Sequence, residues 1–136
     1  MPETPNQILL VEDDEAFADM LQTTLIQGGY AIVHARNGKE ALRLYDAHLP
    51  ILVLTDLIMP DMEGIELIIQ LRRRYPGVKI VAMSGGGRNT PHAYLPMAQL
   101  LGAARTLPKP FSNTELFAAI QAVLAALNVS GDLSGE

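Results

Sequence analysis

Short apolar runs alternate along this chain with longer segments in which apolar residues recur at helical spacing. The runs predict strands at about 8–11, 30–35, 51–55, 78–83 and 103–107. The helical spacing predicts helices at about 15–27, 38–48, 64–74, 91–101 and 112–127. Turn residues such as Gly28-Gly29, Asn37-Gly38 and Pro76-Gly77 separate the segments. The pattern therefore predicts a series of five βα units.

Such a series predicts a parallel sheet with helices on both faces and right-handed crossovers. The run at 51–55 is apolar throughout, which is typical of a strand that is buried on both faces of a parallel sheet. Ser112 and Glu115 have the spacing of a capping box, which marks the start of the last helix. Sheets of this kind place their functional sites at the carboxyl ends of the strands.

The composition fits one cysteine-free domain. The chain has 136 residues, 49% of them apolar, which is enough for an ordinary core. The lack of cysteine excludes disulfides and thiolate metal sites. A net charge of −5 argues against direct nucleic-acid binding, because phosphate contacts need cations. The most apolar stretch, 116–127, is too short to span a bilayer, and residues 1–7 lack a secretion signal. We therefore expect a cytoplasmic protein with no membrane partner.

Polar residues follow four of the five predicted strands. Glu12 and Asp13 follow the first, Asp56 the third, Ser84 the fourth and Lys109 the fifth. Because the carboxyl ends of parallel strands share one edge, three carboxylates, a hydroxyl and an ammonium should gather there. Crowded carboxylates repel each other, and Mg²⁺ would relieve that repulsion. The grouping predicts phosphoryl transfer onto an aspartate.

Each of these residues also has an ordinary interpretation. The acids at 12–15 could simply favour a helix N-terminus, Ser84 could be a loop serine and Lys109 a solvated lysine. Asp56 is harder to dismiss, because an unpaired charge at the end of a buried strand is costly. The joint placement of the residues at four strand ends favours the functional interpretation.

Four segments carry a family resemblance: ILLVEDD at 8–14, TDLIMPDMEG at 55–64, AMSG at 82–85 and LPKPF at 107–111. In this order and spacing, the chain resembles bacterial two-component response-regulator receiver domains, of the stand-alone, chemotaxis-regulator-like kind, over about residues 6–127. The resemblance implies an α/β, flavodoxin-like, doubly wound sheet of five parallel strands in the order 2-1-3-4-5, with five helices. We expect an N-terminal extension at 1–6, a receiver domain at 7–127 and a flexible tail at 128–136.

The same resemblance assigns roles to the strand-end residues. Asp56 would be the phosphoacceptor, and Ser84 and Lys109 would contact the phosphoryl group. The implied Mg²⁺ ligands are Glu12, Asp13, Asp56 and the backbone carbonyl of Ile58. The Lys109–Pro110 peptide bond is expected to be cis, as in the family.

The implied function is signalling. A sensor histidine kinase or a histidine phosphotransfer protein would supply the phosphoryl group, and the resulting conformational shift would be read by an unknown output protein. Such a domain catalyses only its own phosphorylation and dephosphorylation, so we do not expect an enzyme that acts on an outside substrate.

Two features depart from the family pattern. Thr106 stands three residues before Lys109, where many receivers carry an aromatic residue that reports phosphorylation. The connection at 84–91 is long and glycine-rich, and we expect it and the following helix to relay the signal instead.

Two alternatives stay open. Thr106 weakly favours a phosphorylation-independent, receiver-like scaffold, against which the intact strand-end residues argue. A flavodoxin-like small-molecule-binding domain would have a glycine-rich phosphate loop after the first strand, where this chain has acids instead.

Overall fold

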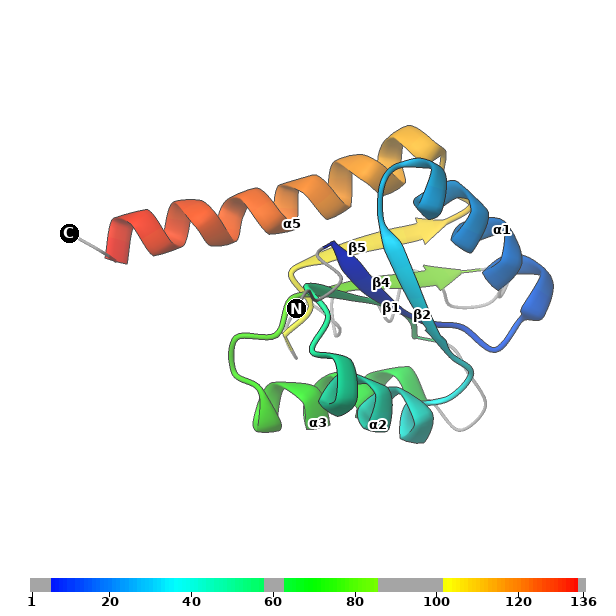
Figure 1. The fold of residues 1–136 in the computed structure, drawn as a ribbon, viewed down its shortest axis with the longest axis horizontal. Helices are drawn as coiled ribbons and strands as arrows, with labels where there is room; N and C mark the ends of the chain where they lie inside the picture. Colours follow the sequence, from blue (N-terminus) through cyan, green and yellow to red (C-terminus); the bar gives the residue numbers. More distant parts are fainter. Residues whose placement is uncertain (1–5, 58–62, 86–101, 135–136) are drawn as a thin grey trace.

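The computed structural model describes residues 6–57, 63–85 and 102–134 of the chain. Its described elements are, in chain order, β1 (Gln7–Val11), α1 (Glu15–Gln27), β2 (Ala31–Ala35), α2 (Gly38–His48), β3 (Leu52–Asp56), α3 (Glu63–Arg74), β4 (Ile80–Gly85), β5 (Arg105–Lys109) and α5 (Asn113–Ser134). Figure 1 shows these elements as a sheet between two layers of helices. The helix predicted at 91–101 lies outside the described residues.

The strands form one parallel sheet in the order β2-β1-β3-β4-β5. The predicted flavodoxin-like topology is therefore confirmed. The internal strand β1 pairs Leu10 with His34 of β2 on one side and with Leu54 of β3 on the other. Because all the strands run in parallel, their carboxyl ends lie at one edge of the sheet.

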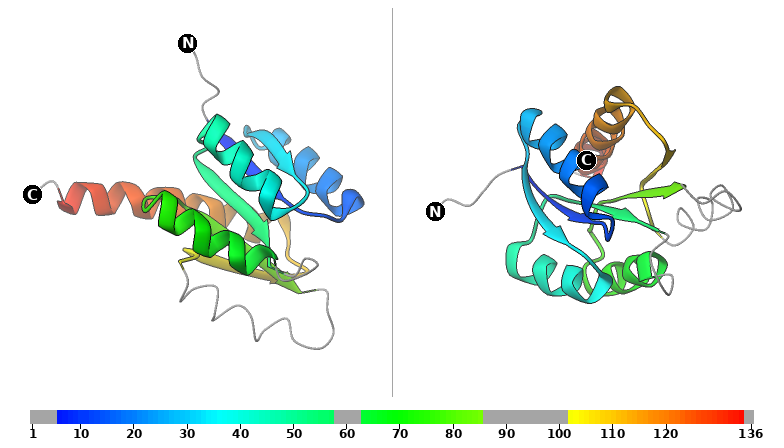
Figure 2. Two further views of the ribbon diagram at one scale, coloured as in Figure 1. Left: turned by 90° about the horizontal axis from the view of Figure 1, so that it is seen from below. Right: turned by 90° about the vertical axis from the view of Figure 1, so that its right-hand side faces the viewer.

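The core lies on both faces of the sheet, and β1 shows why its sequence is apolar at every position. Leu9 and Val11 pack with residues of α2 and α3, whereas Ile8 and Leu10 pack with residues of α1 and α5. Both pairs of side chains are fully buried. Figure 2 shows the corresponding layers, with α1 and α5 on one side of the sheet and α2 and α3 on the other.

Side-chain caps fix the starts of the helices. The Asp14 side chain accepts the backbone N–H of Phe17 at the start of α1, and Asn37 accepts that of Glu40 at the start of α2. The predicted capping box of α5 is present, since Ser112 and Glu115 each accept the other's backbone N–H.

The last helix is longer than its sequence pattern predicts. The amphipathic pattern predicts an end near residue 127, but α5 continues to Ser134, so the predicted end of this helix is wrong. The division into an extension at 1–6, a receiver domain at 7–127 and a tail at 128–136 stays a prediction. The small polar residues after Leu127 lower helix propensity, but none of them is a proline that would break the backbone hydrogen bonds. In Figure 1 this end of α5 extends beyond the sheet. Within the described part of the chain, no helix is long and apolar enough to cross a membrane.

Candidate functional site

The predicted site residues do gather at the carboxyl edge of the sheet. Glu12 directly follows β1, Asp56 ends β3 and Lys109 ends β5. Ser84 lies inside β4, next to Asp56's register partner Met83, and is itself paired with Pro108. The parallel register therefore brings together residues that are far apart in the sequence.

The three acids form one cluster. Glu12, Asp13 and Asp56 each offer a carboxylate oxygen, and these oxygens lie within 4.8 Å of one another. Glu12 is only 1% exposed and Asp56 only 5% exposed, whereas Asp13 is exposed to solvent. Glu12 and Asp56 thus form the buried part of the cluster, and an ion could reach it from the solvent on the side of Asp13.

The electrostatics of the cluster fit a divalent cation. Burial, and secondly the negative charge of Asp56, raise the pKa of Glu12 from 4.5 to about 7. Lys109 opposes this shift, but its single positive charge does not offset the two effects. Clustered carboxylate oxygens with excess negative charge are the donor set that Mg²⁺ prefers, so the residues present fit this ion.

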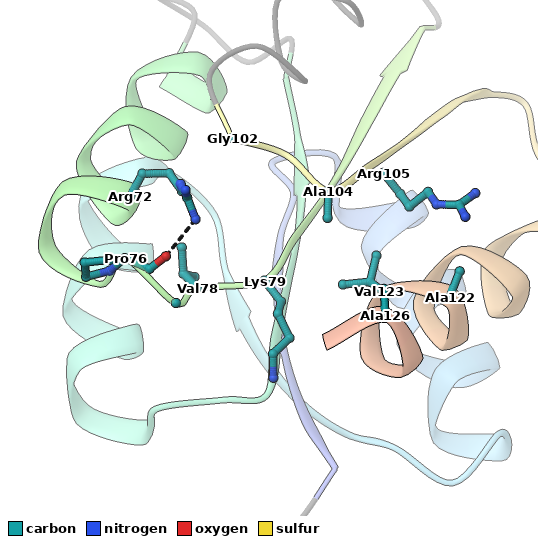
Figure 3. A pocket seen from close by; sticks show the side chains of 11 residues that line it. Arg72, Pro76, Val78, Lys79, Gly102, Ala104, Arg105, Ala122, Val123 and Ala126 are labelled. Atoms are coloured by element: carbon teal, nitrogen blue, oxygen red, sulfur yellow. Dashed lines mark hydrogen bonds between the residues drawn. The ribbon is translucent and has the colours of Figure 1, made fainter. Parts of the chain in front are cut away.

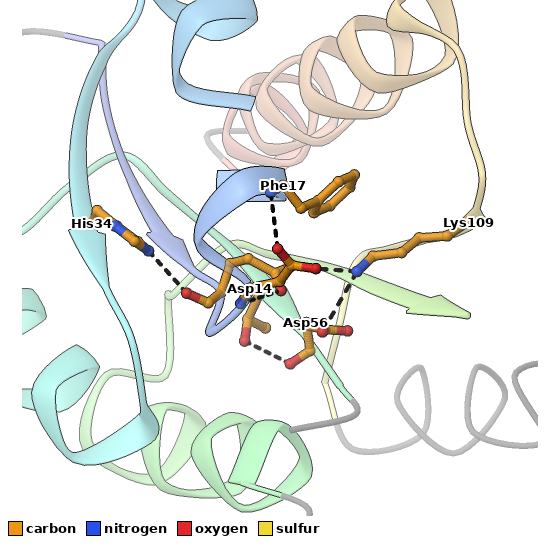
Figure 4. A network of polar contacts seen from close by, with 7 residues as sticks. Asp14, Phe17, His34, Asp56 and Lys109 are labelled. Atoms are coloured by element: carbon orange, nitrogen blue, oxygen red, sulfur yellow. Dashed lines mark hydrogen bonds and ion pairs between the residues drawn. The ribbon is translucent and has the colours of Figure 1, made fainter. Parts of the chain in front are cut away.

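Lys109 bridges the two buried acids. Its Nζ lies 3.4 Å from Glu12 Oε1 and 3.5 Å from Asp56 Oδ2. Figure 4 shows the side chain extending from the end of β5 toward Asp56. The same Nζ lies 4.2 Å from the centroid of the Phe17 ring. The ammonium group is therefore contacted by a residue of β3, a residue of α1 and the residue that follows β1.

Glu12 makes two further contacts, one through its side chain and one through its backbone carbonyl. Its Oε2 accepts the N–H of Asp14 at 3.1 Å, and its carbonyl oxygen lies 2.9 Å from Nε2 of His34 on β2. The start of α3 packs closely against the backbone of Asp56. A Cβ at Gly64 would overlap the carbonyl oxygen of Asp56. Sequence reasoning missed the contact of His34, which lacks any metal-ligand spacing, and that of Phe17, which has the helical spacing of a core residue.

Comparison with known proteins decides the family. The profile of the response regulator receiver domain matches residues 8–121. The chain belongs to the response-regulator receiver family. It is 30% identical over 128 residues to the alkaline phosphatase synthesis transcriptional regulatory protein PhoP of Bacillus subtilis (strain 168), covering 94% of this chain and 52% of that protein. It is 34% identical over 119 residues to the transcriptional regulatory protein CpxR of Escherichia coli (strain K12), covering 88% and 49% respectively.

The solved structures agree with this assignment. The receiver resembles the chemotaxis protein CheY4 of Vibrio cholerae with a TM-score of 0.77 and 26% identity, covering 88% of this chain and 98% of that one. The receiver spans about half the length of PhoP and CpxR. The predicted family is confirmed, whereas its stand-alone, chemotaxis-regulator-like character stays a prediction.

Other predicted features of the receiver have different outcomes. The Lys109–Pro110 bond is cis, as expected. Thr106 lies half-buried on β5, in register with Ala82 of β4. Ile58, residues 86–91 of the glycine-rich connection and the helix predicted after it lie outside the described residues, so the metal-binding carbonyl and the relay through this connection stay predictions.

A pocket elsewhere on the receiver lacks the chemistry of this cluster. It has a volume of about 300 Å³ and lies at the amino ends of β4 and β5, between the end of α3 and α5 (Figure 3). Its described lining is apolar or cationic and includes Arg72, Lys79 and Arg105. Arg72 Nη1 donates to the carbonyl oxygen of Pro76, a common role for a cation at a helix end. This pocket therefore lies at the opposite edge of the sheet from the acidic cluster, and its described lining offers no carboxylate.

Proposed function

We propose that this receiver accepts a phosphoryl group on Asp56 from the phosphohistidine of a sensor kinase or a histidine phosphotransfer protein. The observation that carries the proposal is the setting of the Asp56 carboxylate, which ends β3 beside a buried acid and 3.5 Å from the Lys109 ammonium. A carboxylate in this setting is a nucleophile with a cation already in place for the incoming negative charge.

The reaction is the transfer of a phosphoryl group between two nucleophiles. An Asp56 carboxylate oxygen attacks phosphorus, the bond from phosphorus to the imidazole nitrogen breaks, and the departing histidine takes up a proton. The product is an aspartyl phosphate. Lys109 donates to a phosphoryl oxygen, and the buried hydroxyl of Ser84 on β4 donates to another.

Glu12, Asp13 and Asp56 would hold Mg²⁺, together with the carbonyl of Ile58 that the resemblance implies. The ion would offset the charge that builds up on the phosphoryl oxygens. In its absence, the raised pKa of Glu12 leaves part of the cluster protonated near neutral pH. This supports a site whose carboxylates ionise fully when a cation binds.

Signalling follows from the change at Asp56. Phosphorylation shifts the receiver between conformations, and an output protein of unknown identity binds one of them better. Slow hydrolysis of the aspartyl phosphate resets the receiver, so its catalysis is confined to its own phosphorylation and dephosphorylation.

The test is phosphorylation of the purified protein with acetyl phosphate and Mg²⁺, followed by intact mass. The wild type should gain the mass of one phosphoryl group, and Asp56→Asn should gain none. Asp19→Asn on α1 is the matched control, because Asp19 is an exposed aspartate outside the site. A phosphorylated Asp56→Asn variant would show that another residue accepts the phosphoryl group. An unmodified but folded wild type would favour a phosphorylation-independent scaffold.

A further inference from the structure

One face of an aromatic ring covers the lysine of the site. The Phe17 ring centroid lies 4.2 Å from Lys109 Nζ, within the range of a cation–π interaction. The Lys109 side chain is only 17% exposed, so water screens this attraction little. The ammonium group therefore has three neighbours, the carboxylates of Glu12 and Asp56 and the ring of Phe17. Figure 4 shows Lys109 with Asp56 and Phe17.

Both the backbone and the ring of Phe17 make contacts that fix its position. Phe17 lies in the first turn of α1, where Asp14 accepts its backbone N–H at 3.1 Å. The Phe17 ring also packs edge-to-face with the ring of Phe111, with centroids 6.1 Å apart and an interplanar angle of 73°. Phe111 follows Lys109 by two residues, so the aromatic pair joins the start of α1 to the loop after β5. A ring whose position is fixed in this way limits the conformations that the Lys109 side chain can adopt.

Lys109 needs such a restraint because its ammonium group lies at the end of a flexible four-carbon side chain. Glu12 and Asp56 lie almost equally far from Nζ, so the two acids by themselves do not select Asp56. A ring face offers electrostatic attraction but no hydrogen-bond acceptor that would draw a donor away from the acids. The ring also occupies space into which the stem could otherwise turn.

We propose that Phe17 is a positioning residue that holds the Lys109 ammonium over Asp56, where the phosphoryl group arrives. The role rests on the proposed phosphoacceptor function of Asp56. Phe17 does not contact the reacting atoms and acts through Lys109. It joins α1 to the reaction centre, a link that the strand-end motifs do not include.

The experiment compares rates of phosphorylation by acetyl phosphate with Mg²⁺. Phe17→Leu should slow phosphorylation by about fivefold, the rate equivalent of losing one cation–π contact. Phe17→Tyr keeps an aromatic face and should restore most of the rate. Phe117→Leu is the matched control, because Phe117 is also half-buried but stacks on Tyr30 of the α1–β2 connection. Equal losses in Phe17→Leu and Phe117→Leu would overturn the proposal.

A double-mutant cycle separates positioning from simple packing. With Lys109→Met as the background, Phe17→Leu should cause no further loss of rate. A full fivefold loss in that background would mean that Phe17 acts without Lys109, and the proposal would be wrong.

A spectroscopic readout needs no phosphorylation. The ring current of Phe17 should move the NMR signals of the Lys109 ε-methylene protons upfield in the wild type, and Phe17→Leu should return them toward ordinary lysine positions. Signals at ordinary positions in the wild type would refute the contact. A wild type that shows the shifted signals but never takes up phosphate would instead refute the proposed function of Asp56.

Discussion

The pKa of Glu12 predicts that the metal-free receiver becomes less stable as the pH rises. Burial, followed by the charge of Asp56, raises this pKa from 4.5 to about 7. The folded protein therefore keeps the proton up to about pH 7, whereas the unfolded chain releases it near pH 4.5. Because the folded state binds more protons in this window, the free energy of unfolding falls as the pH rises through it.

The size of the effect follows from the two pKa values. Their difference corresponds to about 3 kcal/mol in total, of which about 2.5 kcal/mol should be lost between about pH 5 and about pH 8. Glu12→Gln keeps the size of the side chain and an oxygen that can accept the Asp14 N–H, but it cannot ionise. The free energy of unfolding of this variant should therefore not fall between about pH 5 and about pH 8. At about pH 8 it should be more stable than the wild type by about 1–2 kcal/mol, since the lost attraction to Lys109 offsets part of the gain.

The assay is urea unfolding at several pH values with a chelator present, with Glu66→Gln as the control. Glu66 is an exposed acid on α3 away from the site, and its variant should follow the wild-type pH profile. Adding Mg²⁺ should stabilise the wild type above about pH 7 much more than Glu12→Gln, because a ligand that binds only the folded state adds to stability. Parallel pH profiles for the wild type and Glu12→Gln would refute the assignment of a raised pKa to this residue.

Three further predictions concern neighbouring residues. Gly64→Ala should lower the free energy of unfolding by about 2–4 kcal/mol, because the new Cβ would overlap Asp56's carbonyl oxygen and lie 2.6 Å from the Cα of Leu57. Gly77→Ala, which meets no atom within 4 Å, should change it little in the same urea titration, and similar losses in both would refute the steric argument. Asp14→Ala should cost about 1 kcal/mol by removing the α1 cap, and an unfolding midpoint unchanged from wild type would count against that cap. Asp13→Ala should abolish Mg²⁺-dependent phosphorylation without loss of fold, and uptake at the wild-type rate would exclude Asp13 as a metal ligand.

The sequence by itself predicted most of the fold, because local periodicity determines which segments form strands and helices. Continuous apolar runs identified strands such as β3 whose two faces are both buried, and the capping box located the start of α5. The positions of Asp56 and Lys109 at strand ends were also predictable, because parallel strands bring their carboxyl ends to a common edge. The end of α5 was not, since weak helix propensity without a proline leaves the stopping point undetermined.

Only the tertiary structure decided how the site residues affect one another. The raised pKa of Glu12 depends on its burial and on the nearness of Asp56, which lies on a different strand. The contact of Phe17 with Lys109 depends on how α1 sits against the end of β5, and the contact of His34 with the Glu12 carbonyl depends on the pairing of β1 with β2. Electrostatic and aromatic interactions act over a few ångströms in space, whatever the separation along the chain. Residue spacing indicates which groups reach the same edge of the sheet, and side-chain packing determines which of them touch.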